Sequence, residues 1–317
     1  MPRSDEVSVL NAIETSGLTR SFDGRVAVED LTLAVPAGTV FGFLGPNGAG
    51  KTTTVRMLAG LIQPTAGEAV VAGHRVASDA DGLRGSVGIL TETPGLYDRL
   101  SARQNLTYFA RLYDLSAAQA EEQVARYLGV LGLWDRRDDP VGTFSKGMRQ
   151  KLAIARALLH GPAVVFLDEP TAGLDPEAAR TVREFVKGLR AEGRTIFLTT
   201  HNLPEADELC DTIAVFERRL LRVGAPAELR ASLFGRGTVV RVVGPADSYV
   251  AAAHTVARVR DVEVDGDTLH VHLDDPDATN PDLIDALRAA GARIRYVEPW
   301  QRSLEDVYLK LVAEERP

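Results

Sequence analysis

The sequence predicts an α/β protein of two domains, the larger built on a mixed sheet and the smaller of α+β type. Its 317 residues exceed the length of the usual single domain. From Lys146 onward, helical segments alternate with short apolar strands, which is typical of a parallel sheet covered by helices. Around residues 222–237 the order changes to strand, helix, strand, strand, helix, strand. We therefore expect domains at residues 8–225 and 226–317.

The N-terminal segment predicts strands that are joined by short turns. Alternating apolar residues mark strands at 13–22, 26–35 and 39–45, and the turn signals DG and PAG separate them. A glycine-rich loop, a helix to about residue 61, and short strands near 68–72 and 87–91 follow.

A helical insertion is expected next. Residues 101–137 change to the period of amphipathic helices, and we place them in a helical subdomain of about residues 95–160. Beyond it, the stretches AVVFLDEP, RTIFLTTH and TIAVFE predict strands that alternate with helices. Their nearly all-apolar composition fits strands that are buried on both faces of a parallel sheet.

The tail predicts a small ferredoxin-like domain, because its βαββαβ order is the one that this fold uses. It contains no catalytic constellation. The expected elements are strands at 238–243, 258–264, 268–273 and 292–297, helices at 246–257 and 280–290, and a last helix from Ser303.

Composition excludes several classes of protein. A formal net charge of −8 argues against a chain whose main task is to bind nucleic acid, and we expect no nucleic acid partner. A single cysteine, Cys210, excludes an internal disulfide and a cysteine-rich metal site. No apolar run approaches the roughly 20 residues that cross a bilayer, and no signal peptide pattern opens the chain. We expect a cytosolic protein that reaches a membrane only through a partner.

The stretch GPNGAGKTT predicts a phosphate-binding loop. It fits G-x-x-x-x-G-K-[ST] and lies between a predicted strand and a predicted helix, which is the context that this motif requires. Lys51 is expected to reach the β and γ phosphates, the Thr52 hydroxyl to ligate Mg²⁺, and Thr53 to touch the α phosphate. The alternative is a glycine-rich turn that only joins strand to helix. The expected nucleotide-binding residues are Gly45, Pro46, Asn47, Gly48, Ala49, Gly50, Lys51, Thr52 and Thr53, with the glycines placed where a Cβ would intrude on the phosphates.

Two carboxylates and a histidine follow neighbouring apolar strands. Asp168 and Glu169 end the strand VVFLD, and His201 follows the strand TIFLTT. Ligands bind at the carboxyl edge of such a sheet, so all three are expected near the γ phosphate. Asp168 is expected to hold Mg²⁺, and Glu169 to orient or deprotonate the attacking water. The alternative for the carboxylates is an ordinary solvated strand end, and for His201 a structural or surface role.

The remaining histidines are interpreted as structural or surface residues. His270 and His272 could share one strand face as metal ligands, but the sequence offers no evident third ligand. The other histidines are His74, His160 and His254.

A second helix start suited to anions lies at TFSKGMRQKLAIARAL, because its first turn holds a serine, a glycine and no acidic residue. With this stretch, then DEP, AGLD and TTH in order behind the phosphate loop, the chain resembles the nucleotide-binding subunit of an ATP-binding-cassette (ABC) transporter over about residues 8–225. The resemblance implies an ABC-type P-loop ATPase core that hydrolyses ATP with Mg²⁺. This core is expected to have a mixed sheet whose N-terminal part is antiparallel, and a helical insertion.

The same resemblance implies that the helix start is the family's signature sequence, formed here by Ser145, Lys146, Gly147 and Met148. In this family the signature contacts the γ phosphate of ATP held by the other subunit, so we expect a head-to-tail homodimer with two ATP at its interface. Phe144, Lys146 and Met148 depart from the common L-S-G-G-Q, which leaves the strength of this contact open. An ordinary serine cap is the local alternative.

The resemblance also implies roles for several single residues, and most of these residues have a local alternative. Glu92 stands where the family usually has a glutamine that senses Mg²⁺ and the attacking water, so it is expected as a metal and catalytic residue that adds negative charge. Phe22 occupies the adenine-stacking position, with a turn or core role as the alternative. Asp175 is expected to couple the two sites at the dimer seam, with a helix cap as the alternative. Gly95, Leu96 and Tyr97 match the edge of the groove that receives a helix of the membrane subunit; packing against the helical insertion is the alternative.

The tail resembles the C-terminal extension of subunits of the daunorubicin and doxorubicin resistance type. This implies an ATP-hydrolysing exporter subunit, peripheral on the cytoplasmic face of the cell membrane, that works with a separate permease. The cargo stays open, since specificity lies in the permease. Rival interpretations are a cassette ATPase acting on nucleic acid or ribosomes, and a regulatory protein whose ATP site is inactive; the retained Lys51, Asp168 and Glu169 disfavour the last.

Overall fold

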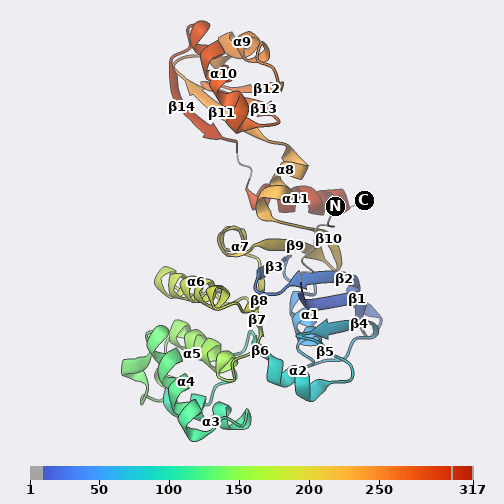
Figure 1. Ribbon diagram of the computed structural model, residues 1–317, viewed down its shortest axis with the longest axis vertical. Helices are drawn as coiled ribbons and strands as arrows, with labels where there is room; N and C mark the ends of the chain where they lie inside the picture. The colour runs from blue at the N-terminus through green and yellow to red at the C-terminus, as the bar shows by residue number, and fades with distance from the viewer. Residues whose placement is uncertain (1–9, 301–302, 316–317) are drawn as a thin grey trace, which may run out of the picture. The chain divides into compact units, whose positions relative to one another are not determined.

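The computed structural model describes residues 10–300 and 303–315 and divides the chain into two compact units, Met1–Ala225 and Pro226–Pro317 (Figure 1). The ends of the two predicted domains, residues 8–9 and 316–317, lie outside the described residues, as do residues 301–302. Each unit has its own core of buried apolar side chains. No helix in the described ranges is long and apolar enough to cross a membrane.

The predicted antiparallel part is confirmed, but it forms a four-stranded sheet of its own in the first unit rather than part of a single mixed sheet. β1 (Asn11–Phe22) and β2 (Arg25–Pro36) form a hairpin whose turn, Asp23 and Gly24, has positive φ at both residues. Such a turn matches the twist of the flanking strands, which explains why the DG signal predicted it. β4 (Ala66–Val71) and the short β5 (His74–Arg75), which was not predicted, complete the order β2-β1-β4-β5.

A six-stranded sheet, mostly parallel, forms the second layer of this unit. Its strands β7 and β8 are buried along their whole length, as their apolar sequences predicted. β10 pairs antiparallel with β9 and was not predicted, because its sequence RLLRVG carries charges at the edge of the sheet. The order is β10-β9-β3-β8-β7-β6, with β3 (Val40–Leu44), β6 (Val87–Leu90), β7 (Val164–Asp168), β8 (Thr195–Thr200), β9 (Thr212–Glu217) and β10 (Arg219–Gly224).

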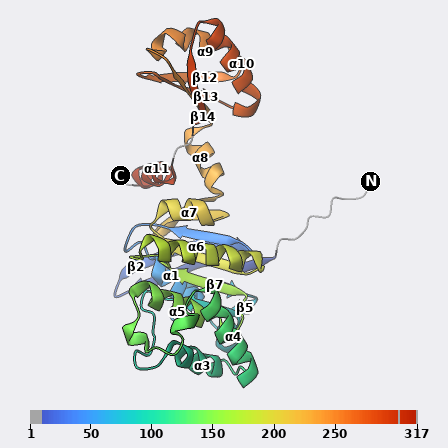
Figure 2. The same cartoon turned by 90° about the vertical axis from the view of Figure 1, so that its left-hand side faces the viewer.

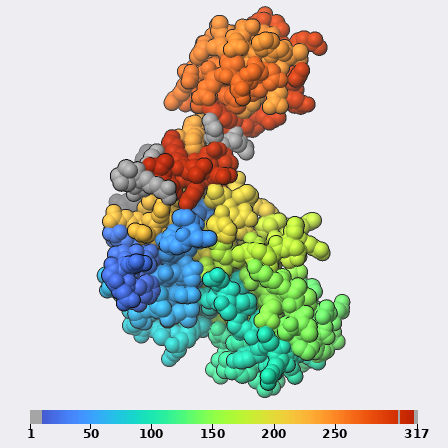
Figure 3. All heavy atoms as spheres, turned by 180° about the vertical axis from the view of Figure 1, so that it is seen from behind, coloured from blue at the N-terminus to red at the C-terminus, as the bar shows by residue number. Residues whose placement is uncertain are grey.

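Helices pack on both sides of the parallel sheet. In Figure 1 the antiparallel sheet lies on one side of it and helices α3–α5 on the other, and Figure 2 shows α5 and α6 in front of the parallel strands. The same parts appear as separate blue and green surfaces in Figure 3. The helices are α1 (Lys51–Leu58), α2 (Ala80–Ser86), α3 (Ala102–Leu112), α4 (Ala117–Val130), α5 (Lys146–Leu158), α6 (Pro176–Ala191) and α7 (Leu203–Leu209), with 3₁₀ turns at Trp134–Arg136 and Val141–Thr143.

Local chemistry sets where these helices begin and end. Ser101 and Ser116 start α3 and α4 with full capping boxes, in which Gln104 and Gln119 reciprocate the serine hydrogen bond. α1 ends at Leu58, before the predicted residue 61, because Gly60 adopts a left-handed φ of 70° that cannot continue a helix.

The second unit confirms the predicted ferredoxin-like arrangement. Its sheet has the order β12-β13-β11-β14, with every neighbouring pair antiparallel. Helices α9 and α10 supply side chains to a core shared with the buried face of this sheet. α8 was not predicted, although Pro226 at its first position is a usual helix start. The elements are α8 (Pro226–Phe234), β11 (Gly237–Val242), a 3₁₀ turn (Ala246–Tyr249), α9 (Val250–His254), β12 (Val259–Asp265), β13 (Thr268–Leu273), α10 (Pro276–Ala289), β14 (Ile294–Pro299) and α11 (Leu304–Glu315).

Candidate functional site

The glycine-rich loop leaves β3 and enters α1, and its glycines are fixed by the protein's own backbone. A Cβ at Gly45 would lie 2.2 Å from the carbonyl oxygen of Phe216, and one at Gly50 would lie 2.2 Å from that of Ala27. Gly48 has a φ of 82° with open space around it. The close packing of the loop on β9 and β2 therefore requires glycine at Gly45 and Gly50, in addition to the predicted approach of the phosphates.

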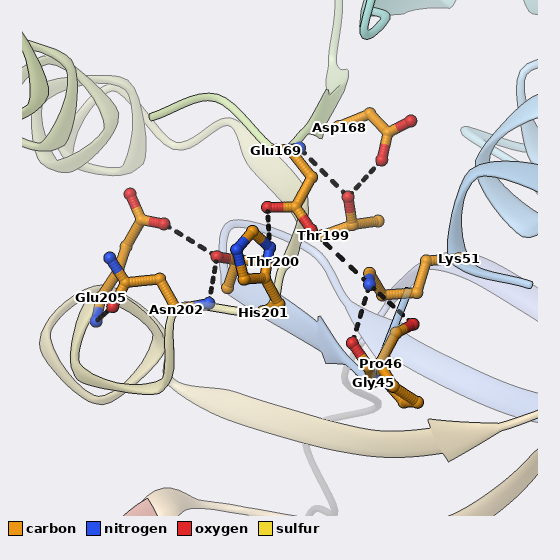
Figure 4. A network of polar contacts seen from close by, with 10 residues as sticks. All are labelled: Gly45, Pro46, Lys51, Asp168, Glu169, Thr199, Thr200, His201, Asn202 and Glu205. Atoms are coloured by element: carbon orange, nitrogen blue, oxygen red, sulfur yellow. Dashed lines mark hydrogen bonds and ion pairs between the residues drawn. The ribbon is translucent and has the colours of Figure 1, made fainter. Parts of the chain in front are cut away.

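Lys51, the first residue of α1, is held by three oxygens (Figure 4). Its Nζ donates to the carbonyl oxygens of Gly45 at 2.7 Å and Pro46 at 3.2 Å, and lies 3.5 Å from Oε1 of Glu169. The side chain is only 6% exposed. A buried ammonium group costs free energy unless it is paired, and here the Glu169 carboxylate supplies the negative partner.

Asp168 and Glu169 leave the end of β7 in two directions. Asp168 is 2% exposed, and its Oδ1 accepts a 2.5 Å hydrogen bond from the Thr199 hydroxyl on β8. Glu169 has a positive φ of 50°, and its N–H donates to the carbonyl and the hydroxyl oxygens of Thr199. This unusual backbone, which costs about 1–3 kcal/mol in a residue with a side chain, turns the Glu169 carboxylate toward Lys51.

His201 completes this network from the end of β8. Its Nδ1 lies 2.9 Å from Oε2 of Glu169, so one carboxylate contacts both a lysine and a histidine (Figure 4). The Thr200 hydroxyl accepts from the N–H of Asn202 and donates to the buried Glu205, which holds the loop that carries His201. Burial raises the pKa of the Glu205 carboxyl above its ordinary value.

A pocket joins the loop to two of the predicted acidic residues. Glu92, in the segment after β6, lines this pocket together with Glu169, so three predicted carboxylates gather at this edge of the sheet when Asp168 is included. Hydroxyl and carboxylate oxygens are the ligands that Mg²⁺ prefers, and Thr52 supplies the hydroxyl, so the residues present fit a magnesium–triphosphate. The lining residues are Ala27, Pro46, Asn47, Gly48, Gly50, Lys51, Thr52, Thr53, Glu92 and Glu169.

The second predicted anion site, at the start of α5, does not line this pocket. Ser145 is the N-cap of α5, and its hydroxyl accepts from the N–H of Met148 at 3.2 Å, which is the serine cap that local chemistry predicts. Lys146 is exposed and Met148 is half-buried in the first turn, whereas Gly147 is buried against α6, where a Cβ would lie 3.0 Å from the Cβ of Ala178. None of the signature residues lines the pocket that holds Lys51.

Three further residues with roles implied by the resemblance, Asp175, Phe22 and Tyr97, lie outside this pocket. Asp175 caps α6 by accepting from the N–H of Ala178 at 2.8 Å. Phe22 is 41% exposed at the β1–β2 turn, beneath the guanidinium of Arg20, and does not line the pocket. Tyr97 is 47% exposed and contacts Tyr108 edge to face.

The sequence analysis did not single out three residues that support the site. Gln150 of α5 is buried and donates to the carbonyl oxygen of Pro170, which ties α5 to the loop after Glu169. Thr199 was missed because its partner Asp168 is brought close only by the parallel pairing of β7 with β8. Glu205 was missed because it acts only through the Thr200 hydroxyl. The TTH stretch did contain a signal for Thr199, since two polar residues, Thr199 and Thr200, end an otherwise apolar strand.

Comparisons with known proteins agree with this geometry. A family model described as "ABC transporter" matches residues 28–172, and one described as "ATP-binding protein DrrA1-3-like, C-terminal domain" matches residues 224–312. The daunorubicin/doxorubicin resistance ATP-binding protein DrrA of Streptomyces peucetius is 39% identical, covering 95% of this chain and 92% of that protein. The Nod factor export ATP-binding protein I of Burkholderia thailandensis is 37% identical, covering 96% and 97%.

Solved structures show the same core. The ATP-binding subunit of an ABC transporter is similar with a TM-score of 0.66 and 32% identity, covering 71% of this chain and 94% of that one. A dimeric ATP-binding cassette in a post-hydrolysis state, bound to ADP and phosphate, has a TM-score of 0.62 at 23% identity and covers 67% and 98%. The chain belongs to the ABC transporter family, as an ATP-hydrolysing, ATP-binding subunit with a DrrA-like C-terminal domain.

Proposed function

We propose that two copies of this chain meet head to tail around two ATP–Mg²⁺ and drive export through a separate permease. One observation carries this proposal: the chain has two helix starts suited to phosphate, and only the one at Lys51 belongs to the nucleotide pocket. A second chain that faces the first would bring its Ser145 helix to the pocket. The solved cassette described above is itself dimeric, which supports a dimer for this chain.

Within each site we assign roles by position. Triphosphate oxygens would replace one of the partners of Lys51, and Glu169, relieved of that ion pair, would serve as the base for the attacking water. His201 would hold the Glu169 carboxylate in place. When bound, the magnesium ion supplies charge neutralisation at the β and γ phosphates; Thr52, Asp168 and Glu92 are the residues that would hold it.

Replacing Glu92 with glutamine is expected to raise the Mg²⁺ concentration that half-saturates ATP hydrolysis by about three- to tenfold, near 1 kcal/mol, because a neutral amide attracts the cation less than a carboxylate. Binding of metal-free ATP should strengthen in the same variant, since a negative charge leaves the pocket. A Mg²⁺ titration of steady-state ATP hydrolysis measures the first effect, and binding of a fluorescent ATP analogue in EDTA measures the second.

The matched control for Glu92→Gln is Glu68→Gln, which neutralises an exposed carboxylate on β4 that does not line the pocket. Equal metal dependence in the wild type and in the Glu92 variant would remove Glu92 from the metal site.

We assign the permease contact to the surface at Gly95, Leu96 and Tyr97. Tyr97, Tyr108 and Leu112 are exposed by 47%, 43% and 60%, and exposed apolar residues gathered in this way mark protein interaction sites. Gly95 lies at the edge of this surface with a positive φ of 58°, which disfavours any other residue, and its carbonyl oxygen accepts from the Arg156 guanidinium at 2.9 Å.

Tyr97→Asp is expected to weaken co-purification with the permease at least tenfold while nucleotide binding stays at the wild-type level. The cause is that a buried interface carboxylate without a partner costs more than about 1.4 kcal/mol. Tyr296→Asp, at a position 59% exposed in the second unit, is the control. Loss of co-purification in both variants, or in neither, would contradict the assignment.

The names of the two curated relatives support export as the direction of transport, and they differ in cargo. We infer that the permease selects the cargo and holds this chain at the cytoplasmic face of the membrane, where ATP is available.

A further inference from the structure

One face of the C-terminal sheet carries a cluster of metal-ligating side chains that the ATPase cycle does not use. On β13, Leu269, Val271 and Leu273 point into the core with α9 and α10, so His270 and His272 alternate onto the opposite face. On β12, Val262 and Val264 pack against that core, and Asp261 and Glu263 alternate in the same way.

Strand pairing brings three of these side chains together. Asp261 is paired with His272 across β12 and β13, and Glu263 follows two residues later on the same face. His272 Nε2 lies 3.3 Å from Oε1 of Glu263. One ligand atom from each of Asp261, Glu263 and His272 lies within 4.8 Å of the other two. Donors around a bound zinc ion lie about 3–3.5 Å apart, so small rotations of the two exposed carboxylates would close the set.

The cluster lacks a balancing positive charge. In residues 10–300 and 303–315, neither Asp261 nor Glu263 forms an ion pair with lysine or arginine; Asp261 accepts only from the backbone N–H of Val262, and Glu263 contacts His272. The arginine next along the strand, Arg260, pairs with Asp274 instead. Two carboxylates with a neutral imidazole would neutralise one divalent cation.

Two further observations favour a ligand here. Nδ1 of His270, beside Glu263 in the strand pairing, is buried and has no hydrogen-bond partner within the described residues, where buried polar atoms are normally paired. The Trp300 ring lies 4.1 Å from the His272 ring, nearly perpendicular to it, and holds it in place. Trp300 fits there because Gly237, across from His272, has no side chain; a Cβ would come within 2.8 Å of the indole.

We propose that Asp261, Glu263 and His272 bind a divalent first-row transition metal ion such as Zn²⁺, outside the ATP site and independent of it. An imidazole with two carboxylates suits such ions better than Mg²⁺, which prefers oxygen ligands alone. Of the two histidines that the sequence offered as a pair, only His272 belongs to this set, and its partners are the two carboxylates rather than His270.

The test uses the full chain without a histidine tag, stripped of metal and nucleotide and kept in excess Mg²⁺. Titration calorimetry with Zn²⁺ is expected to show one saturable equivalent. Co²⁺, which takes similar ligands, should quench the fluorescence of Trp300, read alone in a Trp134→Phe background because the chain has only two tryptophans.

His272→Ala and Glu263→Gln are each expected to weaken Zn²⁺ binding at least tenfold. Asp265→Asn, on the same strand and face but outside the cluster, is the matched control and should bind as the wild type does. Glu263→Gln preserves shape at an exposed position, so its fold is secure, and circular dichroism verifies it. Absence of saturable binding, or equal affinity in all three variants, would overturn the proposal.

Discussion

Glu169→Gln is expected to reduce ATP turnover at least about 100-fold while ATP binding stays equal or tighter. A general base contributes about 10²–10⁴ to rate, and an amide cannot take the proton from the attacking water. The amide also removes a negative charge 3.5 Å from Lys51, where the triphosphate is expected to bind. Because nucleotide then persists at the interface, ATP with Mg²⁺ should convert the variant to a lasting dimer, measured by size-exclusion chromatography with light scattering.

Two comparisons make the Glu169 result specific. Glu184→Gln changes an exposed carboxylate on α6 that pairs with Lys187, and should hydrolyse ATP normally and give no lasting dimer. Glu169→Gln with ADP should elute as a monomer, since ADP lacks the phosphate that would bridge the two chains. A monomer in ATP and Mg²⁺ would contradict the proposed dimer.

The sequence was sufficient where short-range chemistry decides the structure. The apolar strands that end in Asp168 and Thr200 and the glycine-rich loop were predicted because each is a local pattern with one stable environment. The βαββαβ tail was predicted for the same reason. The edge strand β10 and the helix α8 were missed because their sequences show no clear strand or helix period. Tertiary packing, rather than local preference, fixes their structure.

The site shows where reasoning from sequence alone ends. It predicted that Lys51 and Glu169 would lie near one phosphate, but the distance between them depends on the parallel pairing of β7 with β8 and on the left-handed φ of Glu169. The sequence predicted the glycine-rich loop but not every reason for its glycines. At Gly45 and Gly50 a Cβ would clash with the carbonyl oxygens of Phe216 and Ala27. Such long-range contacts have no local signature.

Ser145→Phe is expected to lower ATP turnover at least about 100-fold and to leave ATP binding by the single chain unchanged. The phenyl ring would occupy the space at the start of α5 that the proposed dimer gives to the partner's γ phosphate, and stabilisation of developing charge at such a position is worth about 10²–10³ in rate. Steady-state hydrolysis and binding of a fluorescent ATP analogue to the monomer measure the two quantities.

Loss of the helix cap is a separate effect of the Ser145 change, and Ser116→Phe isolates it. Both serines are exposed N-caps that accept from the third backbone N–H of their helices, at 3.2 Å for Ser145 and 3.3 Å for Ser116, so both variants should lose a similar stability of about 1 kcal/mol. Only the Ser145 variant should lose turnover. Equal turnover in the two would show that the signature helix serves no phosphate.

Mixing two inactive chains separates a contact in trans from one in cis. Lys51→Ala lacks the lysine of the phosphate loop, and Ser145→Phe lacks a usable signature helix. In a head-to-tail dimer of one chain of each kind, the intact loop of the second chain faces the intact signature of the first, so one complete site forms and part of the wild-type turnover returns. If Ser145 served the nucleotide of its own chain, every site would stay incomplete, and the mixture would be as inactive as its components.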